Sequence, residues 1–239
     1  SYQRRFFTKN IKPKILCYQD LTLSDTDIQV AFRSVDAELS LELKYDFNIM
    51  RQATNLGSLI VPHTSTTVLK KTIDSFKAKQ SNSDIFLSHN TTLIISVLEH
   101  LSYLSLKYHC IVDNPPYMGG GKMNKELSDF VKKNYPDSKA DLMACFMEVG
   151  LASLLDNGFL GMINQHSWMF LSSYETLRKK LINDVLIDTL LHLGPRTFPE
   201  IGGEVVQNAS FTLLNSMADL KGIYIRLVDS DSSELKRER

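Results

Sequence analysis

The sequence predicts an α/β fold in which a mostly helical first half precedes a sheet-forming second half. Apolar residues recur at helical spacing through 25–54 and over most of 64–108. Beyond these segments, short apolar runs alternate with helical stretches, as in an open α/β sheet with helices on both faces. The run 206–214 alternates apolar and polar residues, as expected of the return strand of an antiparallel hairpin.

The first half begins with weaker signals. Short strands are expected at 14–18 and 59–61, and Ser24 marks the start of a helix. We expect the chain to divide into three parts: a mainly helical segment with short strands at 1–108, a sheet-forming part at 109–219, and the start of a following segment with a frayed end at 220–239.

The sheet-forming part carries five strand-like runs separated by helical stretches. The strands are expected at 109–112, 159–164, 185–191, 206–214 and 222–228. The helices between them are expected at 124–134, 137–155 and 172–182.

Composition limits the classes of function. The 27 basic and 27 acidic residues cancel, so a broad basic face for nucleic acid is not expected and any DNA contact is local. The three cysteines, Cys17, Cys110 and Cys145, fit neither a disulfide framework nor a zinc pattern, and the last two are interpreted as core thiols. No apolar run approaches the ~20 residues of a membrane span. We therefore expect a cytoplasmic protein without a metal or a membrane contact.

The most informative segment is Asn114-Pro115-Pro116-Tyr117, which directly follows the strand expected at 109–112. Each proline fixes its own φ and lacks an N–H group, and Pro116 also restricts Pro115 to an extended conformation. The turn is therefore stiff and rich in acceptors. It suits the methylation of an exocyclic amine, because the Asn114 side-chain carbonyl and the Pro115 carbonyl can accept the two amino hydrogens and localise the nitrogen lone pair. The Tyr117 ring is placed to stack on a base.

The same four residues are also an ordinary way to end a strand. The glycines at 119–121 and the helix expected at 124–134 favour the functional interpretation, since a strand, a glycine-rich loop and a helix are the setting that such a site needs.

From Asn114 to Asn215 the chain resembles the γ-class adenine-N6 DNA methyltransferases, and most closely the PglX methyltransferases of BREX phage-defence systems. Four runs carry this resemblance, and each is more specific than the tetrapeptide alone: 113–119, 130–142, 161–174 and 192–207. The first half resembles the family weakly, through 4–7 and 55–60.

The resemblance implies a partial Rossmann-like methyltransferase sheet, S-adenosyl-L-methionine as the methyl donor, and double-stranded DNA with a flipped adenine as the substrate. Flipping is also a physical requirement, because a stacked and paired adenine does not present N6 to the donor. Asn114 and Pro115 would hold N6, Pro116 would stiffen the turn, and Tyr117 would stack on the base. Phe198 matches the family's second stacking aromatic, with a core packing role as the alternative. Other defence-system proteins are possible partners.

One departure from the family concerns the cofactor. The glycine-rich turn that should follow a first strand is missing upstream of Asn114, where Gly57 stands alone. We therefore expect the main cofactor site upstream of Ser1, a target-recognition domain beyond residue 239, and an inactive fragment. The missing strands would leave an edge of the sheet open, so pairing of the strand ending at Asp113 with 14–18 or 59–61, or self-association, is expected.

Other residues are weaker candidates. His166 and Trp168 follow a strand end and are read as substrate contacts or as packing residues. His109 and Asp113 are a minor candidate for an acid/base pair. The basic runs 132–133 and 178–180 are read as solvated helix faces, and Gly202-Gly203 as a turn. Two alternative functions remain: methylation of a protein glutamine, whose amide nitrogen poses the same chemical problem, and a non-catalytic module that binds DNA or a partner.

Overall fold

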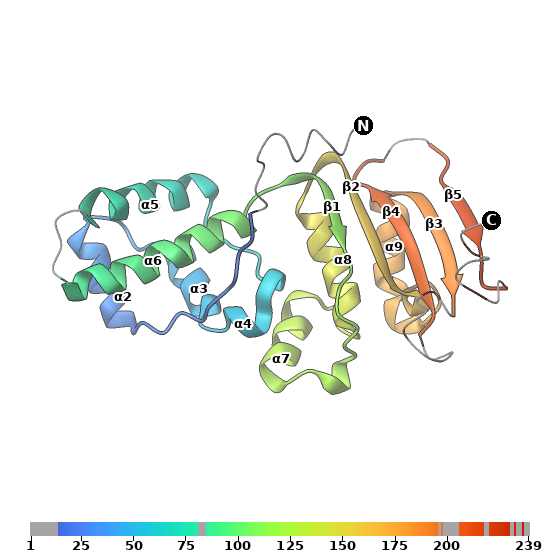
Figure 1. Cartoon of the computed structure of the whole chain (residues 1–239), viewed down its shortest axis with the longest axis horizontal. Helices are drawn as coiled ribbons and strands as arrows, with labels where there is room; N and C mark the ends of the chain where they lie inside the picture. The colour runs from blue at the N-terminus through green and yellow to red at the C-terminus, as the bar shows by residue number, and fades with distance from the viewer. Residues whose placement is uncertain are drawn as a thin grey trace. The chain divides into compact units, whose positions relative to one another are not determined.

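The computed structural model describes residues 14–80, 85–195, 197, 206–217, 220–229, 232 and 236, with backbone alone at 80 and 85–88. The chain forms two compact units, Ser1–Ser105 and Leu106–Arg239, each with its own core. Figure 1 shows the helices of the first unit and the sheet of the second.

The described part of the first unit is helical. Its central contact is aromatic, since the Phe32 ring meets the Phe47 ring at 5.8 Å and the Phe76 ring at 5.0 Å, both edge to face. Around it lie α2 (Asp25–Ser34), α3 (Leu41–Met50), α4 (Ala53–Leu56), the short 3₁₀ helix η1 (Gly57–Leu59), α5 (Thr66–Gln80) and α6 (Ile85–Leu104).

Two expectations for this unit are wrong. The helix expected over 25–54 breaks after α2, where Asp36 has a left-handed φ of 52° and the Ser40 hydroxyl accepts the Leu43 amide hydrogen at 3.2 Å to start α3. Residues 14–18 and 59–61 form no strand. A short apolar run becomes a strand only beside a partner that takes its backbone hydrogen bonds, and this unit has no strand among its described residues.

The second unit is built on a five-stranded mixed sheet of order β1-β2-β4-β3-β5. β1 and β2 are parallel, β4 runs antiparallel between β2 and β3, and β5 is parallel to β3. The five expected strands are found, with bounds shifted by a few residues, and β4 is the antiparallel strand predicted at 206–214. The strands are β1 (Tyr108–Asp113), β2 (Leu154–Gln165), β3 (Leu186–Gly194), β4 (Asn208–Leu214) and β5 (Ile223–Arg226).

Helices connect these strands near the expected positions. They are η2 (Gly120–Lys122), α7 (Lys125–Asn134), α8 (Leu142–Ala152), η3 (His166–Met169), η4 (Ser172–Tyr174) and α9 (Glu175–Asp184). The helix expected from 137 begins only at Leu142, because Asp141 is its N-cap and accepts the Met143 amide hydrogen.

The core of this unit lies on one face of the sheet. Leu160 and Met162 of β2 face Leu213 and Phe211 of β4, and all four pack in one buried cluster with side chains of α8 and α9. Figure 1 shows α8 and α9 on the same side of the sheet. We expected helices on both faces. Among the described helices of this unit, α8 and α9 cover one face, and Phe159 on the opposite face is 41% exposed.

The first strand differs from the buried core strand that we expected. Val112 is 83% exposed, and Cys110 is exposed rather than a core thiol, because both lie on the face opposite α8 and α9. Cys145, on α8, is buried as expected, and burial raises the pKa of its thiol to about 11. β1 is an edge strand, and the segments 14–18 and 59–61 do not become strands that could pair with it.

Within the part of the chain that the structure describes, no helix combines the length and the apolar character needed to cross a membrane.

Candidate methyl-acceptor site

The turn Asn114–Tyr117 leaves the sheet at the carboxyl end of β1. Because β1, β2 and β3 run in the same direction, their carboxyl ends and the start of antiparallel β4 meet at one edge. Open α/β sheets bind ligands at this edge. The Asn114 side chain is exposed, Pro115 is buried, and Tyr117 is half-buried. The sheet thus anchors the turn through its first proline and presents the asparagine to solvent.

The acceptors predicted from the sequence are available. Within the described part of the chain, no hydrogen bond uses the Asn114 side-chain oxygen or the Pro115 carbonyl. Among the described residues, the two oxygens are therefore available to donors of a ligand. Burial raises the pKa of the neighbouring Asp113, and the Asn114 backbone N–H opposes the rise.

Tyr117 is held by its hydroxyl as well as by packing. The hydroxyl donates to Asn208 Oδ1 over 3.3 Å, and Asn208 is buried at the start of β4, between the ends of β2 and β3. The ring packs against the core cluster of the unit. Burial, and after it the negative charge of Asp141, raise the pKa of Tyr117, so the phenol is neutral at ordinary pH. A neutral ring that is held both by its hydroxyl and by packing is suited to stacking.

The far side of the turn is tied to the start of α8. The Met118 N–H donates to Asp141 Oδ1 at 3.0 Å, and the Met118 carbonyl accepts the Leu142 N–H at 3.1 Å. The Gly120 N–H donates to the Ala140 carbonyl at 3.0 Å. These contacts join residues that are 20 to 24 positions apart, and sequence reasoning missed them. The available signal was Asp141 itself, an N-cap residue directly before an apolar helical stripe.

The segment that contains this turn matches a known protein family. Residues 19–198 match the family described as Eco57I restriction-modification methylase. The chain belongs to this methylase family.

Curated relatives agree with that assignment. The chain is 40% identical over 191 residues to the adenine-specific methyltransferase BrxX of Escherichia coli O9:H4 (strain HS), a match that covers 79% of this chain and 16% of that protein. It is 48% identical over 136 residues to the adenine-specific methyltransferase PglX of Lacticaseibacillus casei (strain Zhang), covering 56% of this chain and 11% of that protein. The chain thus spans less than a fifth of the length of either relative. The expected resemblance to methyltransferases of the PglX type is confirmed.

Trp168, a weaker candidate in the methylase site, is a packing residue. It is 3% exposed, its Nε1–H donates to Asn164 Oδ1 at 3.0 Å, and its ring meets the Phe211 ring at 5.1 Å. The side-chain nitrogen of Asn164, Nδ2, is buried and has no hydrogen-bond partner among the described residues.

His166 lies at the edge of the sheet where β2 and β3 end, which is called the functional edge below. Two residues that were not predicted as site residues, Phe170 and His192, lie beside it. His166 Nδ1 is 2.8 Å from His192 Nε2, and the Phe170 ring lies 5.3 Å from the His166 ring and 5.6 Å from the His192 ring. Burial lowers the pKa of both histidines, and the charges of His166 and Arg226 lower that of His192 further. Phe170 is 58% exposed. The His166 backbone N–H donates to the Gln207 carbonyl, which places these three side chains beside Asn208.

The proposed pair of His109 and Asp113 is wrong. Both residues lie in β1, four positions apart, and an extended strand separates such positions by roughly 13 Å. A hydrogen bond between the two side chains is therefore excluded.

The basic runs have structural surroundings. Lys179 pairs with Glu175 at 2.7 Å on the exposed surface of α9, and Lys180 pairs with Asp137, which precedes α8. Arg178 donates to the carbonyls of Trp168 and Leu171 and so ties α9 to the segment after β2. Lys132 and Lys133 are exposed in the last turn of α7. Phe198 and Gly202-Gly203 lie outside the described residues.

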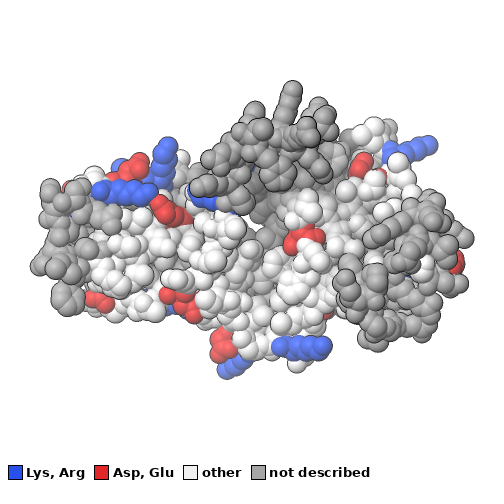
Figure 2. Space-filling view, viewed as in Figure 1, with Lys and Arg blue, Asp and Glu red and all other residues white. Residues whose placement is uncertain are grey.

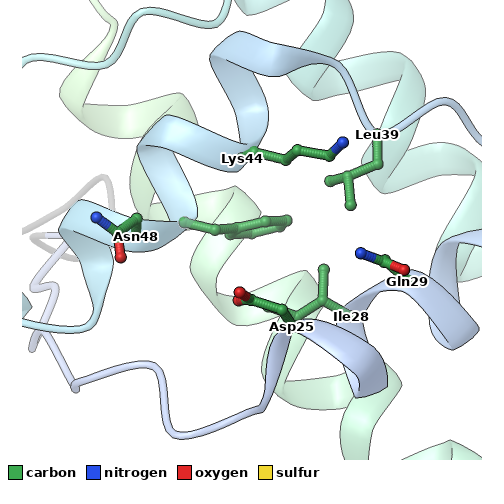
Figure 3. A pocket seen from close by; sticks show the side chains of 7 residues that line it. Asp25, Ile28, Gln29, Leu39, Lys44 and Asn48 are labelled. Atoms are coloured by element: carbon green, nitrogen blue, oxygen red, sulfur yellow. The ribbon is translucent and has the colours of Figure 1, made fainter.

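Elsewhere the described residues offer few sites. On the face drawn in Figure 2, described basic and acidic side chains are interspersed, in keeping with the balanced charge. No group of three or more His, Cys, Asp or Glu side chains in the described ranges is arranged to hold a metal ion. A pocket of about 230 Å³ between α2 and α3 has Phe47 in its wall and Asp25 and Lys44 on opposite sides (Figure 3). It contains none of the predicted site residues.

Proposed function

We propose that this chain supplies the adenine-holding part of a site-specific DNA methyltransferase that methylates N6 of adenine in a phage-defence or restriction–modification system. The observation that carries the proposal is the turn Asn114–Tyr117, which presents two unused acceptors and one fixed aromatic ring at the ligand-binding edge of the sheet. The names of the relatives support adenine as the substrate. We further propose that the chain acts within a longer protein of the length of these relatives, called the intact protein below.

The chemistry follows from the acceptors. The N6 lone pair of adenine is delocalised into the ring, so the amine is a poor nucleophile. Asn114 Oδ1 and the Pro115 carbonyl each accept one N6–H, which favours a pyramidal nitrogen and localises the lone pair. As the methyl group transfers, positive charge develops on N6, and the same two oxygens stabilise it without having to reorganise. Tyr117 stacks on one face of the base, which has left the duplex.

Phe198 is proposed as the second stacking residue. In the sequence it falls between β3 and β4, and the described ends of these two strands, Gly194 and Asn208, lie at the edge of the sheet where Asn114 is found. Base–aromatic stacking is worth about 1–3 kcal/mol per base, so a residue in this place adds substantially to the binding of a flipped adenine.

The methyl donor of this methylase family is S-adenosyl-L-methionine. The described residues upstream of β1 do not fit a site for it. Gly57 is the sole glycine before Gly119 in the sequence, and it follows helix α4 rather than a strand. A glycine-rich turn between a strand and a helix, which lets the backbone approach a nucleotide closely, is not present among these residues. The residues of this chain therefore act on the acceptor adenine.

The test uses the intact protein with S-adenosylmethionine that carries a labelled methyl group. Asn114→Ala should lower the rate of adenine methylation by about 10²–10³-fold, by analogy with the removal of one preorganised oxyanion-hole donor. The fold and donor binding should be retained. Asn124→Ala, which removes an N-cap from α7, is a matched control and should methylate at the wild-type rate. Wild-type methylation by Asn114→Ala would contradict the assignment.

The same assay separates the two alternatives. Label recovered on a protein glutamine, and not on DNA, would identify a glutamine methyltransferase, since the amide nitrogen fits the same two acceptors. DNA binding without any label transfer would identify a non-catalytic module.

A further inference from the structure

Asp141 is placed differently from an ordinary helix cap. It is 8% exposed, and its Oδ1 accepts two backbone N–H groups at 3.0 Å, one from Met143 in its own helix and one from Met118. Met118 directly follows Tyr117 in the sequence. By contrast, Asn124, the cap of α7, accepts Leu127 N–H within its own helix at 2.9 Å.

The link between α8 and the turn is reinforced by the backbone. The Leu142 N–H donates to the Met118 carbonyl, and Gly119 forms an isolated antiparallel bridge with Asp141 itself. Both polar groups of the Met118 backbone are therefore bonded to Asp141 or its neighbour. Hydrogen bonds to an ionised acceptor are shorter and stronger than neutral ones, and a negative charge is favoured at a helix N-terminus.

We propose that Asp141 is a positioning residue for adenine methylation, which locks the chain just after Tyr117 to α8 and thereby fixes the Asn114–Tyr117 turn before the base arrives. The turn is also held by the hydrogen bond between the Tyr117 hydroxyl and Asn208 and by the buried Pro115. Asp141 completes this frame on the far side of the turn, where the chain continues from Tyr117 to Met118. The inference rests on the proposed function, because the turn needs a fixed geometry only if Asn114 and Pro115 hold a reacting amine.

Variants separate this role from that of a helix cap. Asp141→Ser keeps a side-chain oxygen that caps α8, but its hydroxyl is too short to reach the Met118 N–H as well. Asp141→Asn keeps an acceptor oxygen of the original reach. Asp141→Ala removes both bonds, and Asn124→Ala removes the N-cap bond of a different helix, α7.

Two measurements are needed. In this chain, hydrogen exchange of the Met118 amide should accelerate about tenfold or more in Asp141→Ser and Asp141→Ala, since a bond to a charged acceptor is lost. It should stay slow in Asp141→Asn and in Asn124→Ala. In the intact protein, Asp141→Ser should lower kcat on the order of 10²-fold while KM for S-adenosylmethionine stays unchanged. In Asp141→Asn, kcat should stay close to the wild-type value.

Wild-type kcat and slow Met118 exchange in Asp141→Ser would overturn the proposal. A loss of kcat in Asn124→Ala equal to that in Asp141→Ser would also overturn it, because the effect would then follow stability alone. Failure of Asp141→Asn to recover kcat would show that the lost acceptor is not the cause. Asn114→Ala keeps the two proposals apart: if that variant methylates normally, the proposed function fails, whereas a normal Asp141→Ser beside an inactive Asn114→Ala contradicts the positioning role alone.

Discussion

The two units of the chain each contain a buried aspartate that accepts two backbone N–H groups. In the helical unit, Asp46 is fully buried and accepts the amide hydrogens of His63 and Thr64 at 2.9 and 2.8 Å. In the sheet unit, Asp141 accepts those of Met118 and Met143. Both carboxylates accept backbone N–H groups, but the segments that they hold in place differ. Asp46 holds the segment that leads into α5, whereas Asp141 holds the segment that begins with the exposed Asn114.

This difference separates stability from function. The segment held by Asp46 presents no predicted site residue, so we expect its loss to be felt in the free energy of unfolding. The segment held by Asp141 continues directly from the proposed acceptors, Asn114 and Pro115, and from Tyr117, the proposed stacking ring, so we expect its loss to lower the rate of methylation. The same local chemistry thus has a different consequence because of what lies next to it in the sequence.

The largest effect is expected for Asp46→Ala. The variant leaves two backbone N–H groups without their acceptor, one of them in the buried Thr64. Each unsatisfied buried group costs roughly 1–3 kcal/mol, so the free energy of unfolding should fall by about 2–6 kcal/mol. Urea unfolding followed by circular dichroism measures this. Asp25→Ala, which removes an exposed ion pair with Arg51, is the control and should change stability by about 1 kcal/mol or less. Equal effects of the two variants would end the comparison.

The local parts of this structure were predictable from the sequence, and the long-range ties were not. The Asn114–Tyr117 turn and the strand before it follow from neighbouring residues, because two prolines and an apolar run determine their own backbone. The bond from Met118 to Asp141 joins positions 23 residues apart, and nothing in either segment specifies the other. The exposure of Cys110 was missed for a similar reason, since an apolar run does not reveal whether both of its faces are covered.

The second prediction concerns the ring that Asp141 helps to place. In the intact protein, Tyr117→Ala should weaken binding of DNA with a mismatched or flipped adenine by about 1–3 kcal/mol, the usual value of one base–aromatic stack. Tyr117→Phe keeps the ring and loses only the bond to Asn208, so it should bind such DNA nearly as well as the wild type. Fluorescence anisotropy measures both affinities, and Phe198→Ala should behave like Tyr117→Ala. If Tyr117→Phe loses as much affinity as Tyr117→Ala, the hydroxyl rather than the ring is what matters.

A smaller effect is expected from the histidines at the functional edge. The pKa values of His166 and His192 both lie below the ordinary 6.5 because of burial. The unfolded chain therefore binds protons that the folded chain does not as the pH falls through about 6.5, so stability is fully present above this pH and declines below it. His192→Gln should make the stability of the sheet unit less dependent on pH below about 6.5, as measured by urea midpoints. His109→Gln, at an exposed position of β1, serves as the control. An unchanged pH dependence in His192→Gln would exclude the pair as its source.

The smallest signal is expected from S-adenosylmethionine added to this chain alone. If the chain supplies only the acceptor side of the site, then the contacts to the adenosine and methionine parts of the donor are mostly missing, and calorimetric titration should show binding no tighter than the millimolar range, or about −4 kcal/mol. The physical reason is the backbone upstream of β1, where the described elements are helices and the lone Gly57 follows a helix instead of a strand. In the proposed function, Pro115 and Tyr117 supply one wall of the methyl-transfer site, and one wall does not enclose a nucleoside. A micromolar dissociation constant would mean that the donor binds to residues of this chain, and that the division between an acceptor-holding unit and a missing donor site is misplaced.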